Sequence, residues 1–297
     1  LYENLNTQYA SVNEQLDSSV DSVNELTTTI AELNEAIVAL QAQGGDTSSL
    51  EDSRDQAVTE LSELIAVDVT EQADGSYTLT LGQGQPLVSG STAATLSLNN
   101  GDVSLQYNSQ TFSVSDDVGG NIGGLLDYVA EVLEPTLSAL NEQATSIADE
   151  FNTLQASGYD LDSESGSALF TYSSSNAAGS LALADDFTTD DLAFSDSATS
   201  GSSNNNNLLL MLDLQEDQSD SYSTLLADVA IQSSAISATL SANTELVDSV
   251  ESSISSTSGV NSDEEAANLL IYQAAYEANA KVITVAGELF HTLMSMF

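Results

Sequence analysis

The sequence predicts an α+β fold that is mainly α: a long coiled-coil-like helical rod with an inserted small antiparallel β domain and a C-terminal assembly helix. Three observations carry this prediction. Apolar residues recur at spacings of three and four over most of the chain, the spacing changes to two between residues 67 and 118, and the last apolar seam runs to the end of the sequence.

Residues 1–66 are expected to form a helical hairpin of the rod. Gly44-Gly45-Asp46 separates a long helix from a shorter one that contains Arg54. The expected seam of the long helix is Leu5, Tyr9, Val12, Leu16, Val23, Leu26, Ile30, Leu33, Ile37 and Leu40. Because acidic residues surround Arg54 in the sequence, we expect it to form an ion pair with a nearby carboxylate.

Residues 67–118 are expected to form the antiparallel β insertion. Val67, Val69, Leu79 and Leu81 fit an alternating pattern around a tight turn at Asp74-Gly75. The following Gly82-Gln83-Gly84 does not indicate a dinucleotide site, since Pro86 and Val88 favour extended chain where such a site needs the start of a helix.

Four further segments complete the expected organisation. Residues 119–157 form a rod helix that contains Pro135, 158–218 are irregular with short strands, 219–258 return as a rod helix, and 259–297 form the C-terminal axial helix. The expected assembly seam of the last helix is Leu269, Tyr272, Tyr276, Ile283, Phe290, Leu293 and Phe297. An apolar seam of this kind requires a partner helix.

The charge balance excludes several classes of function. The chain carries 46 acidic residues against Arg54 and Lys281, a net charge of -44. Binding to nucleic acid or to an anionic membrane needs cationic side chains, so neither partner is expected. We expect no signal peptide and no apolar run of transmembrane length. A saline or alkaline habitat would explain the composition, because salt screens the repulsion between like charges.

The residues that carry chemistry are few. There is no cysteine and one histidine, His291, which we expect at the surface or in an interface and not in a catalytic role. The acidic run Asp160–Glu164 lacks the glycine and glutamate of a calcium loop. We therefore expect no enzyme, no metal site and no cofactor.

Four stretches carry a resemblance to a known family. They are Gly84-Gln85-Pro86-Leu87-Val88-Ser89-Gly90, the run Gly123-Gly124-Leu125-Leu126-Asp127, the terminal Ser258-Gly259-Val260-Asn261 with Asp263–Leu269, and Tyr276-Glu277-Ala278 with Ala280–Ile283. Together they resemble the hook-associated protein 1 family of flagellar axial proteins. The terminal stretches are shared with hook and rod proteins, whereas the first stretch is more specific to this family.

The resemblance implies a structural role at the hook-filament junction of the bacterial flagellum. The implied partners are other copies of the chain, the hook protein, a neighbouring junction protein and an export chaperone that holds the C-terminal helix. The implied location is extracellular, after type III export, and the implied process is flagellum assembly and motility.

The chain opens at Leu1 inside a helical pattern, which predicts a fragment lacking an N-terminal region. In the resembled family that region supplies the partner of the C-terminal helix, so residues 259–297 are expected to be mobile or self-associated. Two alternatives stay open: another axial subunit of flagellin or hook type, and a cell-surface adhesive module that acts through the β domain.

Overall fold

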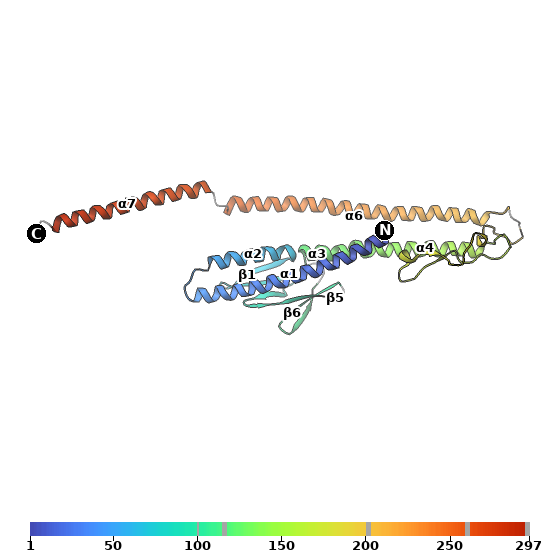
Figure 1. The fold of residues 1–297 in the computed structure, drawn as a ribbon, viewed down its shortest axis with the longest axis horizontal. Helices are drawn as coiled ribbons and strands as arrows, with labels where there is room; N and C mark the ends of the chain where they lie inside the picture. Colours follow the sequence, from blue (N-terminus) through green and yellow to red (C-terminus); the bar gives the residue numbers. More distant parts are fainter. Residues whose placement is uncertain (100, 115–117, 200–202, 259–261, 295–297) are drawn as a thin grey trace. The chain divides into compact units, whose positions relative to one another are not determined.

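A computed structural model describes residues 1–99, 101–114, 118–199, 203–258 and 262–294 of the chain. Long helices and small antiparallel sheets make up these residues (Figure 1), which confirms the predicted mainly helical α+β class. The chain divides into two compact units, Leu1–Gln232 and Ser233–Phe297, and helix α6 (Asn206–Ser258) continues from the first into the second.

The first unit is organised around α1 (Tyr2–Ala42), which packs against α2 (Ser48–Leu64) as a helical hairpin (Figure 1). Residues of α1 at spacings of three and four, such as Leu16, Val20 and Val23, are buried. The hairpin turns at Gly44, whose φ of 69° lies in the left-handed region that favours glycine after a helix.

Two antiparallel sheets pack on this hairpin. The first contains β1 (Val67–Glu71), β2 (Tyr77–Leu81), β3 (Pro86–Ser89) and β4 (Thr92–Ala93), and the second contains β5 (Thr95–Asn99), β6 (Asp102–Tyr107) and β7 (Gln110–Ser113), each in that spatial order. Alternate strand residues, such as Leu79 and Leu105, are buried in the same hydrophobic core as Leu16 of α1 and Leu61 of α2. The strands and the helices therefore stabilise each other.

Two asparagines of α1 attach the sheets to the helix. Asn24 donates from Nδ2 to the carbonyl of Leu96 in β5 at 2.9 Å and accepts the N–H of Leu96 at 2.7 Å. Asn34 makes the same pair of bonds with Tyr77 in β2, both at 2.9 Å, and also donates to the carbonyl of Gly90. The seam expected from the sequence contains Leu33, but Leu33 is half-buried and Asn34 is completely buried because its amide satisfies strand backbone groups.

Arg54 of α2 does not form the expected ion pair within the described residues. Its Nη1 donates to the carbonyl of Gly75 at 2.7 Å and to Oδ1 of Asn34 at 3.1 Å. The guanidinium lies 3.4 Å from the centre of the Tyr77 ring. Only 2% of the residue is exposed. The charge is thus stabilised by a carbonyl, an amide and an aromatic face, whose geometry suits a planar guanidinium.

The chain returns to helix through α3 (Gly120–Asp127), a π-helical turn (Tyr128–Leu133) and α4 (Glu134–Ser157). Pro135 explains the wide turn, since a proline ring clashes with the carbonyl four residues earlier and offers it no N–H. That carbonyl belongs to Glu131, and Nε2 of Gln232 in α6 approaches it at 3.5 Å. The helix therefore continues through Pro135 rather than ending there.

The loops between α4 and α6 contain a short strand pair, β8 (Phe170–Thr171) with β9 (Ala182–Leu183), and the short helix α5 (Ala177–Ser180). Asn152 of α4 pairs with both backbone groups of Phe170, as Asn24 does with Leu96. Helix α6 begins at Asn206, earlier than the expected 219. The side chain of Asn204 accepts the N–H of Asn206 at that start, and Asn207 anchors the first turn to the carbonyls of Leu154 and Ala193.

The second unit contains the end of α6 and α7 (Ser262–Met294). Among the described residues, α6 is the one helix that is long and apolar enough to cross a membrane by length and composition alone. This corrects the expectation of no such segment, which missed α6 because Ser, Thr and Gln interrupt its apolar residues. A single helix of this kind is weak evidence for a membrane span, and its hydroxyl and amide side chains would lie in hydrocarbon.

Candidate functional site

The predicted seam lies on an exposed helix. Tyr276 is 76% exposed and Ile283 is 72% exposed, and Leu269 and Tyr272 are also exposed. Phe290 and Leu293 belong to α7, but their side chains are not among those described, and Phe297 lies outside the described residues. The four described seam residues follow the 3-4 spacing, so α7 places them along one side of the helix.

A second group of apolar residues lies on other sides of α7. Leu270, Ile271, Val282 and Val285 are all exposed. Five polar residues form a strip: Gln273, Glu277, Lys281, Thr284 and Glu288 follow one another at spacings of four, four, three and four residues, while Asn279 lies on the side of the seam. The sequence prediction considered a single seam and therefore did not include the second group. The hydrophobicity of all helical positions around α7 would have indicated it.

A helix with apolar residues on several sides needs neighbouring helices to cover them. An amphipathic surface helix has an apolar stripe on one side, whereas a helix that is apolar on most sides is normally buried. Contact with one neighbouring helix would cover the seam and leave the second group in water. The arrangement therefore fits a position among several helices.

Helix α6 has an exposed apolar stripe of its own. In the first unit Tyr222 is exposed, while Leu225 and Val229 are half-buried. In the second unit the exposed members are Ile236, Leu240, Val247, Val250 and Ile254. These positions lie three, four or seven residues apart, which places them along one side of the helix. Both terminal helices thus present apolar side chains to solvent, which is the chemistry of an assembly surface.

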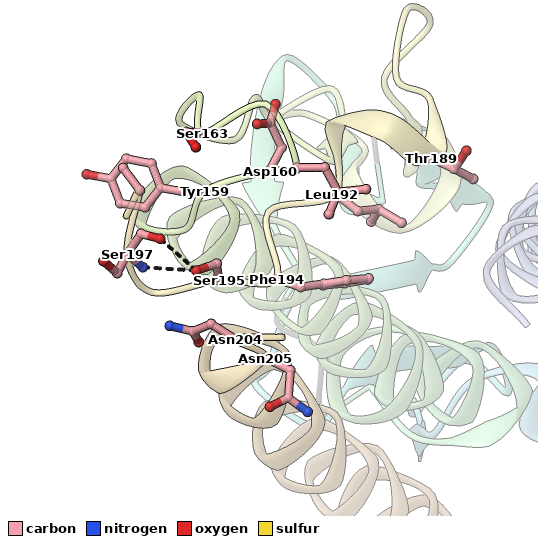
Figure 2. A pocket seen from close by; sticks show the side chains of 12 residues that line it. Tyr159, Asp160, Ser163, Thr189, Leu192, Phe194, Ser195, Ser197, Asn204 and Asn205 are labelled. Atoms are coloured by element: carbon pink, nitrogen blue, oxygen red, sulfur yellow. Dashed lines mark hydrogen bonds between the residues drawn. The ribbon is translucent and has the colours of Figure 1, made fainter. Parts of the chain in front are cut away.

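One cavity of the first unit lies elsewhere, among the loops that precede α6 (Figure 2). It measures about 230 Å³ and is lined by Tyr159, Asp160, Leu192, Phe194 and several serines and asparagines. Ser195 Oγ donates to the carbonyl of Ser197 at 2.8 Å and accepts its N–H at 3.2 Å. Oδ1 of Asp160 accepts the N–H groups of Asp162 and Glu164, both at 2.9 Å. These polar groups hold the loops in shape.

The chemistry of this cavity is limited. The ionisable residues among its described lining are Tyr159 and Asp160, and a general acid or base needs a partner that orients it. Next to the cavity, the amides of Asn206 and Asn204 hold the pKa of Asp196 below its ordinary value. A carboxyl with a lowered pKa remains ionised at neutral pH and is a poor acid. Among the described residues no group of three or more side chains could hold a metal ion.

Two family models match the chain. Residues 1–170 match the helical domain of flagellar hook-associated protein FlgK. Residues 251–296 match the C-terminal model of the flagellar basal body rod FlgEFG proteins. The second match spans all of α7, in agreement with the sequence prediction that this segment is shared by hook and rod proteins.

Known relatives cover nearly the whole chain. Flagellar hook-associated protein 1 of Salmonella typhimurium is 28% identical over 404 residues, which cover 98% of this chain and 73% of the relative. The Escherichia coli K12 protein is 26% identical, and the match covers 98% of this chain and 72% of the relative. The Bacillus subtilis protein is 23% identical, and the match covers 99% of this chain and 67% of the relative. The Salmonella alignment is longer than the 297 residues of this chain, so that relative has additional residues inside the matched region.

A solved structure has a related fold. The flagellar hook junction protein FlgK from Burkholderia pseudomallei is 30% identical in sequence, with a TM-score of 0.53 over 58% of this chain. The match spans 33% of that protein, about a third of its length.

Proposed function

Since the chain belongs to the flagellar hook-associated protein FlgK family, we propose that it joins the hook to the filament as a structural junction protein of the bacterial flagellum. The observation that carries the proposal is the exposed, widely apolar surface of α7, which lies within the segment that matches flagellar axial proteins. A helix that needs several neighbours suits a subunit of a packed helical assembly.

The family assembles with other flagellar axial proteins. For this chain we propose contacts with other copies, with the hook protein and with a neighbouring junction protein. Tyr272, Tyr276 and Ile283 would contribute apolar contacts on α7. Before assembly, an export chaperone would cover the same residues, since an exposed apolar helix aggregates readily in a cell.

We also propose the division of labour along the chain. Residues 1–66, 119–157 and 206–258 would form the rod, 67–118 the β insertion, 158–205 the connecting segment and 259–297 the assembly helix. The subunit would reach the outside of the cell by type III export. It would act without catalysis, in keeping with flagellar relatives that are structural proteins.

Electron microscopy of a deletion strain tests the junction role. Cells without the gene should build hooks of normal length, carry no filaments and release unassembled filament protein into the medium. Re-expression of the gene should restore filaments. Normal filaments in the deletion strain would contradict the proposal, and loss of hooks would assign the chain to an earlier axial position.

A further inference from the structure

A small crevice opens where three parts of the first unit meet. Helix α1 forms one wall, the turn between β5 and β6 forms another, and the segment from α3 to the start of α4 forms the third. The crevice measures about 160 Å³. Clefts that hold drug-sized ligands measure roughly 300–1,000 Å³, so this one has room for a single side chain and not for a cofactor.

The floor and the rim of the crevice differ in chemistry. Leu16 and Leu126 are buried and Tyr9 is half-buried, which gives an apolar floor with an aromatic ring. Asp102 and Glu134 are exposed and line the crevice from opposite walls. Within the described residues, neither carboxylate forms an ion pair or accepts a hydrogen bond.

Two local backbone features border the crevice. Val129 and Ala130, which also line it, belong to the π-helical turn that precedes Pro135. Such turns are rare and occur frequently at functional sites. On the opposite wall, Gly101 has a φ of 88°, a left-handed conformation that allows the tight turn before Asp102.

This combination suits one class of side chain. Lysine and arginine bury an aliphatic stem against apolar groups and keep a cationic head at the surface. The head can lie against an aromatic ring and bind carboxylates through charge-assisted hydrogen bonds. An anion finds no cationic side chain in this lining. A wholly apolar side chain would take water away from the two carboxylates and offer them no partner.

We propose that the crevice receives an arginine or lysine side chain of a different protein. The basic residues of this chain are Arg54, which is 2% exposed, and Lys281. Lys281 follows Glu277 by four residues on α7, a spacing at which opposite charges stabilise each other. A second copy therefore offers little to the crevice, whereas the net charge of -44 attracts a basic partner. The proposal does not depend on the junction role.

NMR titration of the full chain with Nα-acetylarginine amide tests the proposal. In about 0.15 M salt, which screens distant carboxylates, the methyl signals of Leu126 and Val129 should shift to saturation. The neutral analogue Nα-acetylcitrulline amide should leave them in place. Asp102→Asn with Glu134→Gln should weaken the binding of the arginine compound about tenfold. The control Glu142→Gln removes an exposed carboxylate further along α4 and should change the affinity less than twofold.

A further substitution separates the crevice from general attraction to acidic groups. Ala130→Phe narrows the crevice at an exposed position and keeps both carboxylates, so binding should be lost while the circular dichroism spectrum stays unchanged. Unchanged affinity in Ala130→Phe, or equal shifts with the citrulline compound, would overturn the proposal. Shifts produced by unlabelled copies of the chain and abolished by Lys281→Gln would also overturn it, because they would identify a second copy as the occupant. None of these results bears on the junction role, which the deletion strain decides.

Discussion

At the scale of single residues, the buried amide of Asn34 binds the Arg54 guanidinium and strand backbone groups, where a carboxylate would form an ion pair in a protein with balanced charge. Asn34 uses all four of its hydrogen-bonding positions: Nδ2 donates to the carbonyls of Tyr77 and Gly90, and Oδ1 accepts from the N–H of Tyr77 and from Arg54. A neutral amide binds Arg54 without adding charge, whereas a carboxylate at this position would add to the repulsion among the acidic residues.

Asn34→Ala should lower the free energy of unfolding by about 3 kcal/mol, because it removes the side-chain partner of two backbone groups of Tyr77 and one of the two hydrogen bonds of the buried Arg54 guanidinium. Urea unfolding followed by circular dichroism measures the change. The exposed Asn6→Ala variant is the control and should stay within about 0.5 kcal/mol of the unmodified chain. Equal effects of the two substitutions would show that Asn34 does not hold the sheet on α1.

Asp74 gives a prediction for pH. The hydroxyl of Ser76 at 2.7 Å and, to a smaller extent, its N–H at 3.0 Å hold the pKa of Asp74 below the ordinary 3.8. Because the pKa of Asp74 is lowered in the folded chain, its carboxylate stabilises the hairpin at any pH above the ordinary pKa of aspartate. This stabilisation is lost as the pH falls through the lowered pKa.

An NMR titration of the Asp74 carboxyl carbon should therefore give a midpoint below 3.8, and Ser76→Ala should raise it. The comparison between the two chains cancels the general effect of the negative net charge. A midpoint that Ser76→Ala leaves in place would contradict the assignment of the hydroxyl as the main cause.

These residue contacts could not be predicted from the sequence. Asparagine is common in turns, and the bonds of Asn24 and Asn34 reach backbone groups 72 and 43 residues away. Arg54 was assigned an ion pair because carboxylates surround it in the sequence. The fold brings it a carbonyl and an aromatic ring instead, and no local pattern records either contact.

At the scale of elements, α7 is the part that connects structure with assembly. Tyr276 and Ile283 of its predicted seam share a helical face and are exposed. The helix has further apolar residues around it, which the single seam did not include. That the seam mediates assembly stays a prediction. Substitutions inside and outside the seam test whether its side chains are needed for association or only for the stability of the chain.

Ile283→Asp should leave the urea midpoint of the first unit unchanged, because Ile283 belongs to the second unit and its side chain is exposed. The same substitution should abolish self-association at high concentration, since it puts a charge into an apolar contact. Analytical ultracentrifugation measures the association. Thr284→Asp adds the same charge in the polar strip and should associate like the unmodified chain; equal loss in both variants would reject the seam.

Element boundaries were predictable where the apolar period was regular and failed where polar side chains determine them. The period identified α1, α2 and the alternating strands of the two sheets. It missed the start of α6, where Asn204 and Asn207 anchor the first turn. It placed Pro135 inside a rod helix but did not predict the π-helical turn before it, because such a turn depends on how the proline ring is accommodated.

At the scale of the whole molecule, the charge of -44 acts on both stability and assembly. Like charges on a compact chain repel one another more than in the unfolded chain, where they are further apart. Salt shortens the range of that repulsion without changing any specific contact. The two basic residues are too few to offset it by pairing.

The urea midpoint should therefore rise between about 0.05 M and 1 M NaCl. Urea is the suitable denaturant because guanidinium chloride would itself screen the charges. A chain in which two exposed carboxylates are changed to amides, Glu32→Gln with Glu60→Gln, should show a smaller salt effect. A midpoint that stayed flat or fell with salt would contradict a dominant role for repulsion.

Immunogold electron microscopy of intact flagella tests the junction role most directly. Antibody against this chain should label a single short zone at the distal end of the hook, where the filament begins. Label along the whole filament or along the hook would identify another kind of axial subunit. Label on the cell surface away from flagella would identify an adhesive module and contradict the junction role.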